Sequence, residues 1–181
     1  MPDVDEMMRY PVGRFTPPET PTGPEVTAWI DEIAAFPSAV ERVVAGIGDD
    51  VLKTAYRPGG WTARQVIHHL ADSHLNSYIR FKWALTEDRP VIKAYFEERW
   101  AELADYRELR LADSTDFLGL LHRRWVVLLR ALGPVELRRE FLHPSSGPIR
   151  LDQNIGVYAW HGRHHLAQVT TLAATVRSRP R

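Results

Sequence analysis

Two histidines four residues apart stand in the segment Tyr158-Ala-Trp-His-Gly-Arg-His-His-Leu-Ala-Gln168. On an α-helix, His161 and His165 would project from one face, because residues i and i+4 stack one above the other. Two imidazoles presented in this way can bind one divalent metal ion through two ring nitrogens. A third ligand is available in His69, within residues 61–72. These three histidines predict a metal site that leaves one coordination position open.

A metal ion held by three neutral histidines supports two kinds of chemistry. The ion can lower the pKa of a bound water to about 7, so that hydroxide is available at neutral pH. It can equally bind the thiol of a second molecule and deprotonate it. Imidazole suits zinc and also nickel, iron and copper, so the histidines by themselves leave the metal open.

The helix predicted to carry His69 spans residues 62–86. Thr62 is followed three residues later by Gln65, which is the pattern of a capping box at a helix start. This helix is apolar on one face and polar on another. The polar face consists of Gln65, His69, Asp72, Ser73, Asn76 and Arg80.

Three more amphipathic helices are predicted at residues 25–45, 114–132 and 152–176, and the last of these carries the histidine pair. Four long helices without a convincing alternating strand pattern predict an all-α fold, most simply a four-helix bundle. Bundles commonly build metal sites from inward residues on facing helices.

Local features add detail to this prediction. Pro37 predicts a kink or a break in the first long helix. Asp113 or Ser114 is the predicted cap of the third long helix, and Asp152 that of the last. Between these helices we expect a short helix within residues 95–103 and a turn or hairpin loop at 141–148.

Residues 1–24 form a separate region with six prolines. Proline lacks an amide hydrogen and disfavours a helical residue before it, so an extended arm is predicted. Tyr10, Val12 and Phe15 suggest that the arm lies against the body. The bundle domain is therefore expected at residues 25–181.

Composition narrows the classes of function. Lys+Arg and Asp+Glu both number 23, and this zero net charge argues against a nucleic-acid partner. The absence of cysteine excludes thiolate ligands and a cysteine nucleophile. No apolar run approaches the ~20 residues of a membrane span. The acidic start of the chain lacks the apolar core of a signal peptide, so a cytoplasmic location and no membrane partner are expected.

Four other polar residues are candidates for catalysis or binding. Asp72 can orient a ligand imidazole by accepting its second N–H, or it can be a helix-pairing carboxylate. Arg80 can hold an anionic group of a substrate or pair with an acidic residue that follows it. Asn76 shares their helix face, and His143 is a candidate general base.

The other histidines have weaker cases. His68 and His164 are predicted to point about 100° away from the ligand positions. His74 and His122 have no partner visible in the sequence. Gln168 can support a ligand histidine or lie on a solvated face.

The chain resembles the DinB/YfiT superfamily, and its YfiT branch in particular. The resemblance rests on Gly-Gly-Trp-Thr-x-Arg-Gln-Val-x-His-His-Leu-Ala-Asp within residues 59–82, on Tyr-Pro-Val-Gly at 10–13, on Phe-x-His-Pro at 141–144, and on Tyr-x-Trp-His-x-x-His-His at 158–165. It implies a four-helix bundle, usually a homodimer, with one divalent metal per subunit, zinc or nickel. The implied ligands are His69, which directly precedes Leu-Ala-Asp, together with His161 and His165.

The same resemblance implies more than one activity. YfiT-like proteins carry the label of metal-dependent hydrolase, whereas relatives in the superfamily transfer or isomerise with bacillithiol or mycothiol. Our first hypothesis is a metal-dependent transferase that joins a small thiol to an electrophile, with Asn76 and Arg80 contacting the thiol. The second is a hydrolase with Asp72 or His143 as base. The third is a non-catalytic, dimeric module stabilised by a metal.

Overall fold

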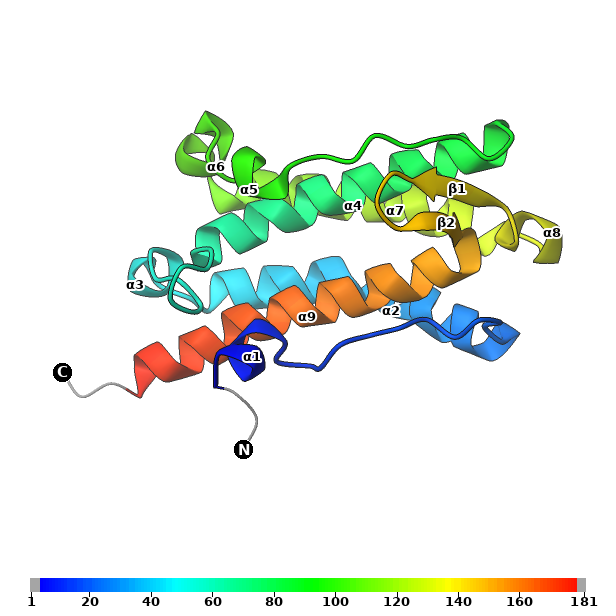
Figure 1. Cartoon of the computed structure of the whole chain (residues 1–181). Coiled ribbons are helices and arrows are strands. Elements are labelled where there is room, and N and C mark those ends of the chain that lie inside the picture. The colour runs from blue at the N-terminus through cyan, green and yellow to red at the C-terminus, as the bar shows by residue number, and fades with distance from the viewer. Residues whose placement is uncertain (1–3, 179–181) are drawn as a thin grey trace.

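The structure is a computed structural model that describes residues 4–178. Four long helices form its body, and they are α2 (Gly23–Ala45), α4 (Ala63–Thr86), α7 (Leu111–Arg130) and α9 (Leu151–Arg177). Helix α2 packs against α7 and α9, and α4 packs against the same two helices (Figure 1). The chain therefore crosses the bundle diagonally from α2 to α4 and again from α7 to α9. The predicted all-α four-helix bundle is confirmed.

Short elements connect and flank the long helices. A two-stranded antiparallel hairpin pairs β1 (Glu140–His143) with β2 (Gly147–Arg150), with Phe141 opposite Ile149, and lies against α4 and α9. Its second strand begins at Gly147, directly after the turn, with φ 75°, a backbone conformation that favours glycine. This hairpin is the predicted turn or hairpin loop, and it adds strand structure that the all-α prediction did not include. The short elements are α1 (Val4–Arg9), α3 (Asp49–Leu52), α5 (Glu97–Trp100), α6 (Ala104–Glu108), α8 (Pro134–Leu137), β1 (Glu140–His143) and β2 (Gly147–Arg150).

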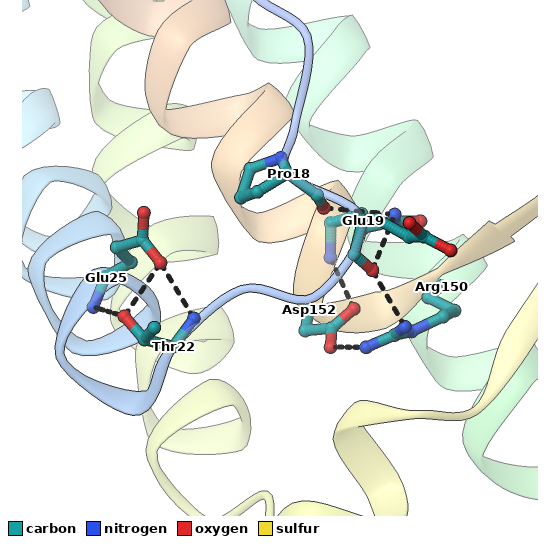
Figure 2. Close-up of polar contacts among 7 residues, drawn as sticks. Pro18, Glu19, Thr22, Glu25, Arg150 and Asp152 are labelled. Atoms are coloured by element: carbon teal, nitrogen blue, oxygen red, sulfur yellow. Dashed lines mark hydrogen bonds and ion pairs between the residues drawn. The ribbon is translucent and has the colours of Figure 1, made fainter.

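The start of α4 agrees with the predicted capping box. The Thr62 hydroxyl accepts a hydrogen bond from the backbone N–H of Gln65 at 3.2 Å. The side-chain oxygen of Gln65 accepts one from the backbone N–H of Thr62 at 3.0 Å. Thr22 and Glu25 form the same motif at the start of α2, two residues before the predicted start (Figure 2). Helix α2 runs through Pro37 without a break.

Two predicted caps were wrong. Helix α7 begins at Leu111, so both predicted caps, Asp113 and Ser114, lie inside its first turn, and Asp113 instead forms an ion pair with Arg110 at 2.8 Å. Helix α9 begins at Leu151, so Asp152 lies inside its first turn and pairs with Arg150. In both cases an arginine precedes the helix and binds the nearby carboxylate, which is then not available as a cap.

The N-terminal arm packs on α9. The Pro18 and Glu19 carbonyls accept hydrogen bonds from Gln153 and Arg150 at the start of that helix, at 3.3 and 3.0 Å (Figure 2). Further back, Trp160 donates to the Gly13 carbonyl at 3.0 Å. The arm differs from the prediction at its start, because residues 4–9 are helical. That stretch contains no proline, so nothing in it opposes a helix.

A polar layer divides the interior of the bundle. One apolar cluster includes Trp125, Phe81 and Phe141, and a second includes Leu70, Leu118 and Val169 near the other end. Between the two clusters the long helices bury polar side chains instead. These are His69, Ser73, His74, Ser77, Arg80, His122, His164 and Gln168.

No helix within residues 4–178 combines the length and hydropathy needed to cross a bilayer.

Gly162 of α9 makes the fold sensitive to a single methyl group. A Cβ there would lie 2.9 Å from the ring of Phe36, which is itself buried. Gly119 of α7 is a matched control, because its nearest neighbour would be 4.0 Å away. We expect Gly119→Ala to stabilise the protein by up to about 1 kcal/mol through helix propensity, and Gly162→Ala to destabilise it. Denaturant unfolding of both variants measures this difference, and equal shifts would contradict it.

Candidate metal centre

Three histidines from two helices converge beside a cavity. His69 projects from α4, and His161 and His165 project from α9 one turn apart. One ring nitrogen of each lies within 4.8 Å of the others. The ring centroids are 4.5 Å apart for His161 and His165, and 4.9 Å apart for His69 and His165. The structure thus brings together the three residues that the sequence selected.

The spacing of these nitrogens fits one bound ion. Nε2 of His69 and Nε2 of His161 lie 3.3 Å apart. Two nitrogens at metal bond lengths of about 2.0–2.1 Å and tetrahedral angles would be separated by about 3.3 Å. Burial lowers the pKa of His69 to about 4, and burial followed by the neighbouring histidines lowers the pKa values of His161 and His165 well below the usual range. The three imidazoles are therefore neutral at neutral pH, as metal ligands must be.

A chain of hydrogen bonds fixes the orientation of His161. Nδ1 of His122 lies 2.7 Å from the Ile33 carbonyl oxygen, which can only accept, so this nitrogen carries the proton. Nε2 of His122 then accepts from Nδ1 of His74 at 2.8 Å, and Nε2 of His74 accepts from Nδ1 of His161 at 3.2 Å. With each ring neutral, Nε2 of His161 is left without a proton and faces the other two ligands.

Gln168 fixes His165 in the same way. Its side-chain oxygen accepts from Nδ1 of His165 at 2.9 Å, which leaves Nε2 of that ring without a proton. The amide nitrogen of Gln168 donates to the Arg9 carbonyl at 3.0 Å and to Nε2 of His164 at 3.1 Å. His69 is held differently, by packing against Trp61 with ring centroids 4.6 Å apart. Its buried Nδ1 makes no hydrogen bond to any residue between 4 and 178.

The cavity beside these histidines has a volume of about 650 Å³. Ser73 and Tyr158 lie next to the ligands, with the Ser73 hydroxyl 3.4 Å from both Nε2 of His161 and the Tyr158 hydroxyl. The N-terminal arm and the loop before α4 complete its wall. Other lining residues are Arg9, Tyr10, Tyr56, Arg57, Gly59, Gly60, Trp61, Arg80, Ala94, Tyr95, Glu97, Glu98, His143, Ser145, His164 and Gln168.

Of the four candidate catalytic residues, Arg80 and His143 line the cavity, and Asp72 and Asn76 do not. Asp72 accepts a hydrogen bond from the Tyr106 hydroxyl at 2.7 Å, and among residues 4–178 its carboxylate makes none to His69, His161 or His165. Burial raises the pKa of this carboxyl. Asn76 lies at the expected angle on α4, but its amide turns back and donates to the Asp72 carbonyl at 2.8 Å.

The remaining histidines have partners that the sequence did not reveal. His68 contacts the Ser114 hydroxyl at 2.7 Å and points away from the ligands, as expected. His74 and His122 form the chain behind His161, although they stand 48 positions apart on α4 and α7. The sequence could have indicated this pair only through one feature: each histidine is a polar residue at a helix position where an apolar, buried residue would be expected. Ser73 and Tyr158 share helix faces with the ligands, one turn away.

The fold and the three histidines define a four-helix-bundle protein with a candidate metal centre. The chain belongs to the DinB superfamily, which it matches over residues 32–169. A protein of Oceanobacillus iheyensis, named "Putative metal-dependent hydrolase", is 50% identical over 164 residues, which cover 91% of this chain and 95% of that protein. A Bacillus mycoides protein of the same description is 50% identical over 165 residues, with the same two coverages.

A solved structure extends this similarity to the fold. It is described as "YfiT from Bacillus subtilis is a probable metal-dependent hydrolase with an unusual four-helix bundle topology". The two structures share a TM-score of 0.91 and 41% sequence identity, over 94% of this chain and 98% of that one. In this chain, α2 and α4 are consecutive long helices but lie diagonally opposite each other, and so do α7 and α9.

The buried histidine chain predicts a pH dependence of stability. His122 is 1% exposed, and burial lowers its pKa to about 4. The unfolded chain has the higher pKa, about 6.5, and therefore takes up the proton first. The free energy of unfolding should be highest above about pH 6.5 and fall as the pH drops toward 4, by up to about 1.4 kcal/mol per pH unit from this group.

Denaturant unfolding of the metal-free protein at several pH values measures this slope. His122→Asn keeps a donor near the Ile33 carbonyl and removes the titrating ring. The variant should show a shallower slope than the parent between pH 6.5 and 4. An identical slope would show that His122 takes up its proton equally in the folded and unfolded states.

Proposed function

We propose that this chain is a metal-dependent hydrolase in which His69, His161 and His165 hold one divalent ion, zinc or nickel. The observation that carries the proposal is the convergence of these imidazoles beside the cavity, with the protonated nitrogens of His161 and His165 turned away by hydrogen bonds. The names of the relatives support the same class of reaction. When bound, such an ion supplies Lewis acidity and lowers the pKa of water.

The residues around the ligands bind and orient the substrate. The hydroxyls of Ser73 and Tyr158 stand beside His161 and can donate hydrogen bonds to a substrate carbonyl oxygen. Trp61 packs against His69 and His165 and shields that side of the site from water. His143 acts as a donor, because its Nδ1 already accepts from the Ser145 amide nitrogen at 3.3 Å and its other nitrogen then carries the proton.

A second candidate is transfer of a small thiol, such as a bacillithiol-like molecule, to an electrophile. This candidate is favoured because the acidic and basic side chains near the site are poorly placed to act as a general base. Glu97 and Glu98 are the carboxylates among the described residues that line the cavity, and both are exposed. Asp72 is bound by Tyr106, and His143 is held as a donor. A thiol nucleophile with a lowered pKa needs no protein base to take its proton at neutral pH, because it is already ionised.

Assembly as a homodimer and a cytoplasmic location stay predictions of the sequence.

The ligand assignment predicts graded effects on metal binding. His161→Ala and His165→Ala should lose most of the bound zinc or nickel, because each removes one of three donors. His74→Leu should weaken binding by about 10–100-fold, since it releases Nδ1 of His161 and frees the ring to turn. His68→Ala is the matched control: it neighbours His69 in sequence but contacts Ser114.

Metal content is measured by elemental analysis after loading and desalting, and affinity by competition with a chromophoric chelator. Unchanged metal content in His161→Ala and His165→Ala would refute the assignment. Loss of metal from His68→Ala to the same extent would show that the effect is general unfolding.

The reaction class is tested by turnover of metal-loaded protein. A panel of esters and amides is assayed without thiol, and monochlorobimane is assayed with thiols of different headgroups. The hydrolase proposal expects ester or amide turnover that needs no thiol, stops with chelator and is absent from His161→Ala. Turnover that requires a thiol would establish the transferase instead. Inactivity in both assays, with metal content and stability intact, would favour the non-catalytic module.

A further inference from the structure

Arg80 is a buried cation for which the described part of the chain supplies no ion-pair partner. Its side chain is on α4, is 9% exposed and lines the same cavity as the three histidines. Its guanidinium forms no hydrogen bond or ion pair with any residue from Val4 to Ser178, and it stays open to the cavity. An arginine stays charged under all physiological conditions, so it cannot escape the cost of burial by losing its proton. A fixed positive charge in this position is stabilised when an anion enters the cavity.

The groups beside Arg80 are also donors. Burial, and after it the positive charge of Arg80, lowers the pKa of His143, so that this imidazole is neutral and offers one N–H. Burial raises the pKa of Tyr95, so its hydroxyl keeps its proton. Both residues line the cavity. The Ser145 hydroxyl lies 3.0 Å from Nδ1 of His143 and fixes the orientation of the imidazole.

We propose that Arg80, His143 and Tyr95 form a site for a carboxylate or phosphate group. An arginine fork matches the two oxygens of either group, and charge-assisted hydrogen bonds of this kind are about twice as strong as neutral ones. The imidazole N–H and the phenol O–H supply further donors. The carboxylates that line the cavity, Glu97 and Glu98, are exposed and form no ion pair with Arg80 among the described residues.

The position of this site defines the substrate class, a step that rests on the proposed function. Arg80 follows His69 by eleven residues, which is three helical turns and about 20° of rotation. The two side chains therefore project from one face of α4, with their Cα atoms about 16 Å apart along the helix. Side chains on a helix lean toward its N-terminus, so the guanidinium leans toward the histidines. The substrate is then an elongated small molecule with its reacting group at the histidines and an anionic group at Arg80.

Anion binding is tested on the full chain with two probes, succinate and inorganic phosphate, by titration calorimetry. Each titration is performed on metal-loaded and on chelator-treated protein. Arg80→Gln should weaken binding by at least about tenfold, and Arg80→Lys should retain part of it, because lysine keeps the charge but not the fork. Arg130→Gln is the matched control, since Arg130 is an exposed arginine that pairs with Asp31 at 2.9 Å on the outside of the bundle.

The outcomes separate this inference from the proposed function. Binding that survives the chelator and is lost in Arg80→Gln supports the site, and the better probe identifies carboxylate or phosphate. Binding that disappears with the metal, persists in Arg80→Gln or is equally weakened in Arg130→Gln overturns it, as does the failure of both probes to bind. Because no turnover is measured, an inactive protein leaves the anion site standing. Conversely, the loss of the anion site leaves the metal assignment unaffected.

In the absence of anions, Arg80→Gln should unfold at the same temperature as the parent protein or higher, because it removes an uncompensated charge. Strong destabilisation would show that Arg80 supports the fold instead. Succinate or phosphate, whichever binds, should raise the unfolding temperature of the parent and of Arg130→Gln but not of Arg80→Gln.

Discussion

The bundle is organised around imidazoles that stay uncharged in its interior. Burial between two apolar clusters removes the proton that water would allow them to hold, and neutrality gives each ring one donor and one acceptor. The backbone carbonyl of Ile33 can only accept a hydrogen bond. This one group therefore sets the donor and acceptor of every hydrogen bond that links His122 through His74 to His161. The direction of the hydrogen bonds determines which nitrogen of His161 is available for a ligand. Packing in the core and chemistry at the site therefore depend on the same desolvation.

The N-terminal arm is part of this arrangement. Gln168 connects the Arg9 carbonyl to Nδ1 of His165, so a segment outside the bundle helps to orient a residue inside it. Tyr10 also packs near His164, with ring centroids 5.6 Å apart. Both termini of the described chain lie on the same side of the molecule (Figure 1). The sequence led us to expect that the arm lies against the body, and in the structure it also forms one wall of the cavity, which the sequence did not indicate.

Much of the fold follows from local sequence, because helix periodicity and capping act over a few residues. The capping box at Thr62 shows this, and so does the shared face of His161 and His165. One kind of failure arises where a partner comes from elsewhere in the chain, and another where a neighbouring residue competes for the same group. No local pattern shows that His74 meets His122 from another helix, or that Tyr106 takes the carboxylate of Asp72. The caps at Asp113 and Asp152 failed because a neighbouring arginine competes for each carboxylate.

The diagonal path of the chain has a consequence for biosynthesis. The candidate ligands lie on the second and the last of the four long helices, and 92 positions separate His69 from His161. A nascent chain that has completed α7 therefore holds one ligand, His69, and lacks the helix that covers it. Until the final helix leaves the ribosome, the histidine layer faces solvent and its rings are free to take up protons. The candidate site therefore cannot form before α9 has been made, and an ion captured there would mark a chain in which this helix has folded.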